Sequence, residues 1–282
     1  MARIIQRKKL VPNIHLLEVY APEVARKARP GQFVILMPDE FGERIPLTIA
    51  DWDAEKGTVT SVFMIVGTST AKLAQLRTGD EIPVYVGPLG RPSEIDYFGS
   101  VLCAGGCFGL GAIYPLARAY KQAGNRVVTL LDVRARYLLY WEDKLRSVSD
   151  EVHLVSRDDQ KLPQEYIPYR LKMILEQGGH LDRVHVIGCT YLMATCSEAT
   201  RPYKVKTIVS LNPIMLDGTG MCGACRVTVG GATRFACVDG PDFDGHLVDW
   251  NELYARRKAY LEDESRSLCE WETRIYPEEE II

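Results

Sequence analysis

Two glycine-rich loops near the C-terminus constrain the fold of this chain more than any other feature. The first reads L-D-G-T-G-M-C-G-A-C-R-V and the second reads F-A-C-V-D-G. A Cys-x-x-Cys spacing lets two thiolates converge from one tight loop, and the glycines permit positive φ angles and a close backbone approach to a bulky group. The pattern predicts a metal site whose four ligands are Asp217, Cys222, Cys225 and Cys237.

The residues alone leave two metals open for this site. Tetrahedral zinc accepts three thiolates and a carboxylate, whereas the large number of glycines in these loops favours an iron–sulfur cluster. Asp-Gly is also a common turn dipeptide, so Asp217 has a second interpretation as a turn residue. The other five cysteines lack partners at ligand spacing and are interpreted as small apolar residues.

Composition excludes several function classes. The 282 residues carry a net charge of −3 without a basic run, so no nucleic-acid binding is expected. The N-terminus has too few consecutive apolar residues for a signal peptide or a membrane span, which makes the cytoplasm the expected location. A chain of this length without an export signal is expected to keep its eight cysteines reduced.

Residues 1–97 read as short strands separated by glycine and proline, which predicts a small antiparallel β-barrel. The strand candidates are H-L-L-E-V-Y, G-Q-F-V-I-L-M-P, I-P-L-T-I-A-D, T-V-T-S-V-F-M-I-V and D-E-I-P-V-Y-V-G-P-L-G. One helix start interrupts them at G-T-S-T-A-K-L-A-Q-L, where hydroxyl side chains offer caps. The barrel is therefore expected to present a helix N-terminus.

In residues 98–205 the spacing of apolar residues changes to a pattern of alternating strands and helices. This pattern predicts an α/β domain with an open parallel sheet. Residues 100–104 form an apolar strand candidate, 112–123 an amphipathic helix, and V-V-T-L-L-D-V the next strand. Further strands are expected at E-V-H-L-V-S and R-V-H-V-I-G-C, with a helix over 166–177. Residues 206–282 hold the cysteine loops and one charged helix, predicted over 249–265. The whole chain is thus predicted to be a multidomain α+β protein.

Glycines between the first strand and helix of the α/β domain indicate a phosphate-binding turn. In A-G-G-C-F-G, missing side chains let a pyrophosphate approach backbone N–H groups at the positive end of a helix. A tight turn that only serves helix–sheet packing is the alternative. In the barrel, Arg44 precedes Pro46-Leu47-Thr48, a cation and a hydroxyl suited to a flavin and its phosphates.

Taken together, R-I-P-L-T, G-T-S-T-A-K-L, G-P-L-G, A-G-G-C-F-G and the cysteine loops resemble the ferredoxin–NADP reductase superfamily. Within it, S-L-N-P-I-M-L-D-G-T-G-M-C-G-A-C-R-V closely resembles the small subunits of NADH-dependent reduced ferredoxin:NADP+ oxidoreductases, the sulfide dehydrogenase small-subunit type. The resemblance covers nearly the whole chain. The electron-transfer subunit of dihydroorotate dehydrogenase is similar in plan, with a four-cysteine site.

The resemblance implies cofactors and their residues. It assigns Asp217, Cys222, Cys225 and Cys237 to a [2Fe–2S] cluster. FAD is assigned to Arg44, Pro46, Leu47, Thr48, Gly67, Thr68, Ser69, Gly87, Pro88, Leu89 and Gly90. NAD(H) or NADP(H) is assigned to Gly105, Gly106 and Gly109. No classical acid–base catalytic residue is required.

Two departures from the family pattern fall on the nicotinamide subsite. The family usually has a third glycine and a proline in the nucleotide loop, where this chain has Cys107 and then Gly111-Ala112. The Gly-Pro that is usual near the nicotinamide is Gly188-Cys189 here. The preference between NADH and NADPH stays open as well. Asp132 favours a ribose hydroxyl, whereas Arg134 and Arg136 favour a phosphate.

The resemblance further implies an electron-transfer flavoprotein subunit, with electrons passing from NAD(P)H through FAD and the cluster to a larger flavoprotein that carries [4Fe–4S] clusters. Flavin-based electron bifurcation, with ferredoxin as an indirect partner, is the function expected for that complex. The helix over 249–265 and the acidic tail P-E-E-E are candidate docking elements. The alternatives are an electron-supplying subunit for a hydrogenase, a sulfite reductase or a dihydroorotate dehydrogenase, and a zinc-stabilised binding module without catalytic activity.

Overall fold

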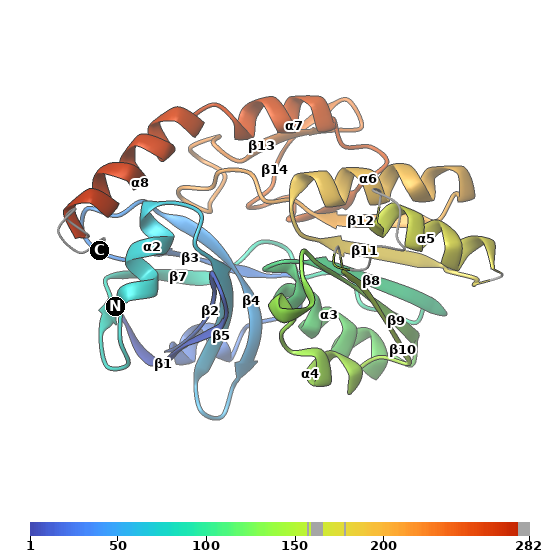
Figure 1. Ribbon diagram of the computed structural model, residues 1–282, viewed down its shortest axis with the longest axis horizontal. Coiled ribbons are helices and arrows are strands. Elements are labelled where there is room, and N and C mark those ends of the chain that lie inside the picture. Colours follow the sequence, from blue (N-terminus) through green and yellow to red (C-terminus); the bar gives the residue numbers. More distant parts are fainter. Residues whose placement is uncertain (157, 159–165, 178, 276–282) are drawn as a thin grey trace.

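The computed structural model describes residues 1–275 except 157, 159–165 and 178 (Figure 1). Two large sheets lie side by side, and a cysteine-bearing segment with two helices crosses over both of them (Figure 1). The acidic tail at residues 277–280 lies outside the described residues. No helix in the described part of the chain is long and apolar enough to cross a membrane.

The N-terminal sheet is a nearly closed antiparallel barrel of seven strands in the order β6-β1-β2-β5-β4-β3-β7. β6 and β7 are separated only by Pro83 yet pair with opposite edges of this sheet, so the sheet must curl around on itself. Side chains such as Leu17, Ile49 and Val59 fill the interior, and Leu73 of the helix α2 closes one end. The elements are β1 (Ala2–Val11), β2 (Ile14–Tyr20), α1 (Pro22–Ala25), β3 (Phe33–Met37), β4 (Ile45–Asp53), β5 (Thr58–Met64), α2 (Thr68–Gln75), β6 (Glu81–Ile82) and β7 (Val84–Leu89).

The second sheet has six strands in the order β10-β9-β8-β11-β12-β15, parallel except for β15. Alternate side chains of β8 face opposite layers: Val101 and Cys103 pack with α3, whereas Leu102 and Ala104 pack with α6. The elements are β8 (Ser100–Gly106), α3 (Gly109–Gln122), β9 (Arg126–Val133), α4 (Glu142–Arg146), β10 (Glu151–Ser156), α5 (Tyr166–Glu176), β11 (Arg183–Ile187), α6 (Thr190–Thr200), β12 (Lys206–Ser210) and β15 (Asp242–Asp244), with short 3-10 turns at Arg136–Leu138 and Arg201–Tyr203.

The predicted fold class, an antiparallel barrel followed by a parallel α/β sheet and a cysteine domain, is confirmed. Strand order reverses between β8 and β11, where open α/β sheets bind ligands at their carboxyl edge. The strands β1, β12 and β15 were not predicted. The domain boundaries at 97 and 205 stay a prediction. The predicted last segment, 206–282, contributes two strands, β12 and β15, to the second sheet.

The single helix predicted over 249–265 is wrong, because two helices occupy this region: α7 (Trp250–Arg257) and α8 (Leu261–Ile275). Asp249 caps α7, and its carboxylate accepts the Glu252 N–H at 2.9 Å. At the break, Lys258 and Ala259 donate to carbonyls three residues earlier, which tightens the turn and ends the α-helix. No proline or glycine marks this break in the sequence.

An ion triad joins the barrel to the second sheet. The Asp51 carboxylate in β4 forms two ion pairs: Oδ1 lies 2.9 Å from Arg118 Nη1 of α3, and Oδ2 lies 2.5 Å from Lys144 Nζ of α4. Each carboxylate oxygen holds one cation, and all three side chains are partly buried, so solvent screens the triad less than an exposed pair. The triad adds to an apolar contact in which Ile14, Ala50 and Val62 of the barrel share one buried cluster with α3.

Candidate functional site

The predicted metal ligands come from one loop and one strand end beside the hairpin β13 (Arg226–Val229) and β14 (Ala232–Phe235). Cys225 and Cys237 are both 1% exposed, and their Sγ atoms lie 3.2 Å apart. Burial and the neighbouring thiol raise the pKa of Cys237. A buried thiol pair of this kind is suited to bind a metal, which would displace the two protons.

Asp217 and Cys222 form a second, more exposed pair. The Asp217 carboxylate accepts the backbone N–H groups of Thr219 and Cys222, each at 2.8 Å. The hydrogen bond from Thr219, followed by those from Cys222, lowers the pKa of Asp217, so the group is an anion at neutral pH. As predicted, Gly218, Gly220 and Gly223 have positive φ angles, of 75°, 83° and 68°.

Two contacts join the four predicted ligands in pairs: the Sγ atoms of Cys225 and Cys237 lie side by side, and the Asp217 carboxylate accepts the Cys222 backbone N–H. No group of three or more histidine, cysteine, aspartate or glutamate side chains in the described part of the chain is gathered tightly enough to hold a single metal ion. Two donor pairs on glycine-rich loops fit a two-iron cluster, in which each iron takes two protein ligands. The donor set consists of one carboxylate and three thiols.

The cysteine loops pack against the barrel. Phe33 and Ile35 of β3 form a buried cluster with Met215, Cys225 and Cys237. Leu89 of β7 packs against the same cluster, and a Cβ on Gly218 would lie 2.6 Å from Leu89 Cδ1. The predicted turn at residues 87–90 is thus in direct contact with the predicted ligand loop.

Strand register places the predicted flavin residues on this same face of the barrel. Thr48 pairs with Phe33 and Pro46 pairs with Ile35, and directly opposed residues of antiparallel strands point to one side. Leu47 points the other way and is buried in the barrel core at 9% exposure. Its side chain belongs to that core, so only its backbone is available to a flavin. Arg44 is exposed just before β4 begins.

The N-terminus of α2 lies next to Arg44 in space. The Ser69 hydroxyl accepts the Glu43 N–H at 3.1 Å, which joins the helix to the residue before Arg44. A Cβ on Gly67 would meet no atom within 4 Å, so the space in front of the helix is open. The first N–H groups of a helix lack intrahelical partners and attract anions. An open glycine, helix N–H groups and a nearby cation fit the pyrophosphate of FAD.

The C-terminal helix α8 lies beside the helix α2, above it in the view of Figure 1. The hydroxyls of Thr68 in α2 and Ser267 in α8 lie 2.8 Å apart. Nothing in the sequence predicted this contact between residues 199 positions apart. The helix α8 therefore borders the predicted flavin site.

The glycine loop of the second sheet is tightly packed. A Cβ on Gly109 would lie 2.1 Å from the carbonyl oxygen of Ile187, and one on Gly105 would lie 2.9 Å from the Gly109 oxygen. Cys107, where the family usually has a glycine, adopts a φ of 52°. Packing thus accounts for these glycines even without a ligand, so the alternative raised from the sequence remains.

Tyr140 organises this loop, although sequence reasoning did not single it out. Its hydroxyl donates to the carbonyl of Cys107 at 2.9 Å, with the Phe108 carbonyl at 3.2 Å, and accepts the Gly111 N–H at 3.0 Å. Burial raises the pKa of Tyr140 far above its ordinary value, so the hydroxyl stays protonated as a donor. Tyr140 lies in the same buried cluster as α3 but 29 positions beyond Gly111, and no sequence signal marks this contact.

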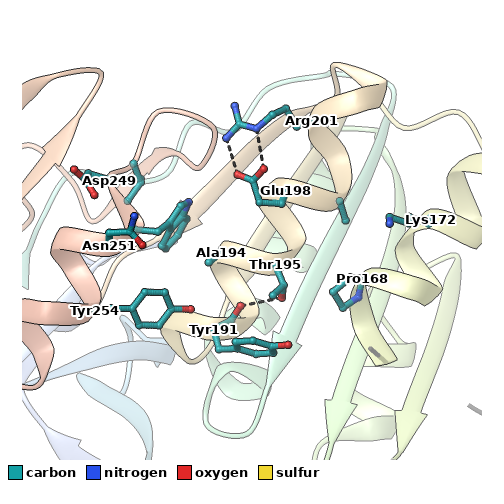
Figure 2. Close-up of a pocket in the computed structure, with 13 residues that line it drawn as sticks. Pro168, Lys172, Tyr191, Ala194, Thr195, Glu198, Arg201, Asp249, Asn251 and Tyr254 are labelled. Atoms are coloured by element: carbon teal, nitrogen blue, oxygen red, sulfur yellow. Dashed lines mark hydrogen bonds and ion pairs between the residues drawn. The ribbon is translucent and has the colours of Figure 1, made fainter. Parts of the chain in front are cut away.

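A cavity of about 600 Å³ lies between α5, α6 and α7, away from the predicted site residues (Figure 2). Tyr191 and Tyr254 border it at one end, and Glu198 pairs with Arg201 at the other at 2.7 Å. None of the residues predicted to bind a cofactor lines this cavity.

Comparison with known proteins supplies independent findings. Residues 212–249 match the family model of the iron-sulfur cluster binding domain of dihydroorotate dehydrogenase B. The chain is 42% identical to a dihydroorotate dehydrogenase B (NAD(+)) electron transfer subunit homolog of Thermotoga maritima, over 94% of this chain and 93% of that protein. It is 43% identical to an uncharacterized protein of Clostridium beijerinckii, from the adh 3' region, over 96% and 95% of the two chains.

A solved structure extends the likeness to three dimensions. It belongs to a study of flavin-based electron bifurcation by an NADH-dependent reduced ferredoxin-NADP oxidoreductase. Its TM-score is 0.89 at 40% sequence identity, and the match covers 96% of this chain and 98% of that chain.

Proposed function

The chain belongs to the family of dihydroorotate dehydrogenase B electron-transfer subunits and their homologues, and we propose that it serves an electron-bifurcating reductase. It is an oxidoreductase subunit whose cofactors are FAD, NAD(H) and an iron–sulfur cluster. When these are bound, the flavin exchanges two electrons with nicotinamide and single electrons with the cluster. The protein's task is to hold the three groups in order and exclude water between them.

The shared face of the barrel and the cysteine loops supports this proposal most directly. Cys225 and Cys237 are buried against Phe33 and Ile35, and the residues paired with those two, Thr48 and Pro46, belong to the predicted flavin strand. Electrons would therefore have a short, dry path between the two sites. In this proposal Arg44, Gly67 and Ser69 hold the flavin phosphates, and Asp217, Cys222, Cys225 and Cys237 hold a [2Fe–2S] cluster.

We further propose a partner, a larger flavoprotein subunit with [4Fe–4S] clusters that exchanges electrons with ferredoxin. The likeness in fold and sequence to the bifurcating oxidoreductase supports this choice. The 42% identity to the dihydroorotate dehydrogenase B electron transfer subunit homolog supports a dihydroorotate dehydrogenase partner as the second candidate. The eight cysteines fit a reducing compartment such as the cytoplasm.

Anaerobic purification of the native protein from its source tests the proposal. A larger flavoprotein subunit should co-purify, with FAD and about two irons and two sulfides for each copy of this chain. Recovery with a hydrogenase, a sulfite reductase or a dihydroorotate dehydrogenase would replace the proposed partner. A colourless protein that holds zinc and no flavin would overturn the electron-transfer proposal altogether.

Asp217 is expected to be a ligand of the cluster, and substitution tests this. Asp217→Cys should retain the cluster with a changed visible and electron paramagnetic resonance spectrum, since thiolate is a softer donor than carboxylate. Asp217→Ala should lower the iron and sulfide content, because one iron loses a protein ligand. Asp239→Asn is the matched control, because its amide oxygen can still accept the Phe235 N–H that the Asp239 carboxylate accepts at 2.8 Å, and it should leave iron, sulfide and spectrum unchanged. Unchanged content and spectrum in both Asp217 variants would remove this residue from the ligand set.

A further inference from the structure

The helix α7 connects the cysteine loop to the α/β sheet through two consecutive arginines. Arg256 Nη2 donates to the carbonyl oxygen of Ala224 at 3.0 Å, and Ala224 directly precedes Cys225. Arg257 turns to the other side and donates to the Thr190 hydroxyl at 2.8 Å, at the start of α6. Leu253, 1% exposed, anchors the helix one turn earlier. The position of Arg256 beside the ligand loop is therefore fixed by packing.

Arg256 has an incomplete set of hydrogen bonds. Its Nε atom is buried and has no hydrogen-bond partner among the described residues. Burying a guanidinium N–H without an acceptor is unfavourable, and such groups are rare in native proteins, so this one calls for an explanation. The helix thus keeps a cation and a spare N–H next to Cys225 at a cost in stability.

A second arginine offers a comparison on the same loop. Arg226 Nη1 donates to the Gly223 carbonyl at 3.2 Å, so both arginines bond to neighbouring carbonyls of the ligand loop. Arg226 is exposed, whereas Arg256 is partly buried. Solvent and salt screen an exposed charge far more strongly than a buried one.

We propose that Arg256 is a positioning residue for the iron–sulfur cluster. It holds the ligand loop and raises the reduction potential of the cluster with its partly buried positive charge. Reduction adds one negative charge to the site, and a nearby cation stabilises that charged state. Hydrogen bonds and charges around the ligands are known means by which proteins set such potentials. The inference rests on the proposed function only in that this loop holds a cluster.

A redox titration of three variants, Arg256→Gln, Arg256→Lys and Arg226→Gln, tests the role. Each full-length variant is purified anaerobically, and the reduced cluster is followed by electron paramagnetic resonance. We expect Arg256→Gln to lower the equilibrium constant for one-electron reduction of the cluster about tenfold. This corresponds to a reduction potential about 59 mV lower. Arg256→Lys should retain most of the wild-type potential, and Arg226→Gln should change the equilibrium less than about twofold, because its charge is screened.

Several outcomes would overturn the proposal. One is a wild-type potential in a fully loaded Arg256→Gln protein, and another is an equal shift in Arg226→Gln. Loss of the cluster from Arg256→Gln alone would support the positioning role, whereas loss from both Arg256 variants would contradict the role of charge. A wild-type protein without iron and sulfide would contradict the proposed function instead, so the two failures are distinguishable.

Discussion

Replacing Cys225 with alanine is expected to remove the iron–sulfur cluster and leave the flavin bound. The Cys225 sulfur is buried 3.2 Å from that of Cys237, so no water or other side chain can readily take its place as a ligand. The iron and sulfide content should fall to less than about a tenth of the wild-type value, because one iron loses a thiolate in a dry site. Flavin absorbance should persist, since the predicted flavin residues belong to the barrel.

Cys269→Ala is the matched control for this prediction. Cys269 is an exposed thiol on α8, without a partner at ligand spacing, so its loss should leave iron, sulfide and flavin unchanged. Iron and sulfide assays together with the visible spectrum measure both variants. A Cys225→Ala protein that retains its full cluster would exclude this cysteine as a ligand. Loss of flavin together with iron would indicate that the cysteine loop also supports the barrel through Phe33 and Ile35.

Local sequence spacing predicted the backbone conformation of the cysteine loop, for a physical reason, whereas its role as a ligand loop stays a prediction. A tight loop with two cysteines needs glycines at positive φ, and Gly218, Gly220 and Gly223 all take such angles. Most barrel strands were also visible, because alternation and turn residues are local signals. The strand β1 was missed because its sequence is rich in exposed basic residues, and only its first part buries side chains such as Ile4.

Long-range contacts were beyond the sequence. Tyr140 holds the glycine loop from 33 positions away, and Arg256 reaches Ala224 from 32 positions away. A single sequence contains no sign of which distant side chain will satisfy a loop carbonyl. The break between α7 and α8 was hidden for another reason, since it depends on three-residue hydrogen bonds rather than on proline or glycine.

The face that the predicted flavin strand shares with the cysteine loop could be found only by combining the sequence motifs with the strand register of the structure. The sequence placed Thr48 on a strand and Cys225 in a loop, but it did not relate them. The register of β3 against β4 puts Thr48 and Phe33 on one side, and Phe33 belongs to the buried cluster with Cys225. The proposed electron path between the flavin and the cluster therefore depends on this one strand pairing.

Gly109→Ala is expected to destabilise the protein strongly. The new Cβ would lie 2.1 Å from the Ile187 carbonyl oxygen, so the backbone of β11 or α3 must move. Alanine favours the helix by about 1 kcal/mol, but overpacking against rigid backbone should cost about 3 kcal/mol, for a net loss of roughly 2 kcal/mol in the free energy of unfolding.

Gly67→Ala is the opposite case and completes the test. A Cβ there meets no atom within 4 Å, and the φ of −171° suits any residue, so the free energy of unfolding should change by less than about 0.5 kcal/mol. The added methyl group instead fills the space proposed for the FAD pyrophosphate, and flavin content should fall. Urea denaturation of the apoproteins and flavin assays of the purified variants measure these effects. Equal denaturation midpoints for Gly109→Ala and wild type, with NADH binding lost, would show that Gly109 serves the nucleotide rather than packing, because the backbone would then have accepted the methyl group.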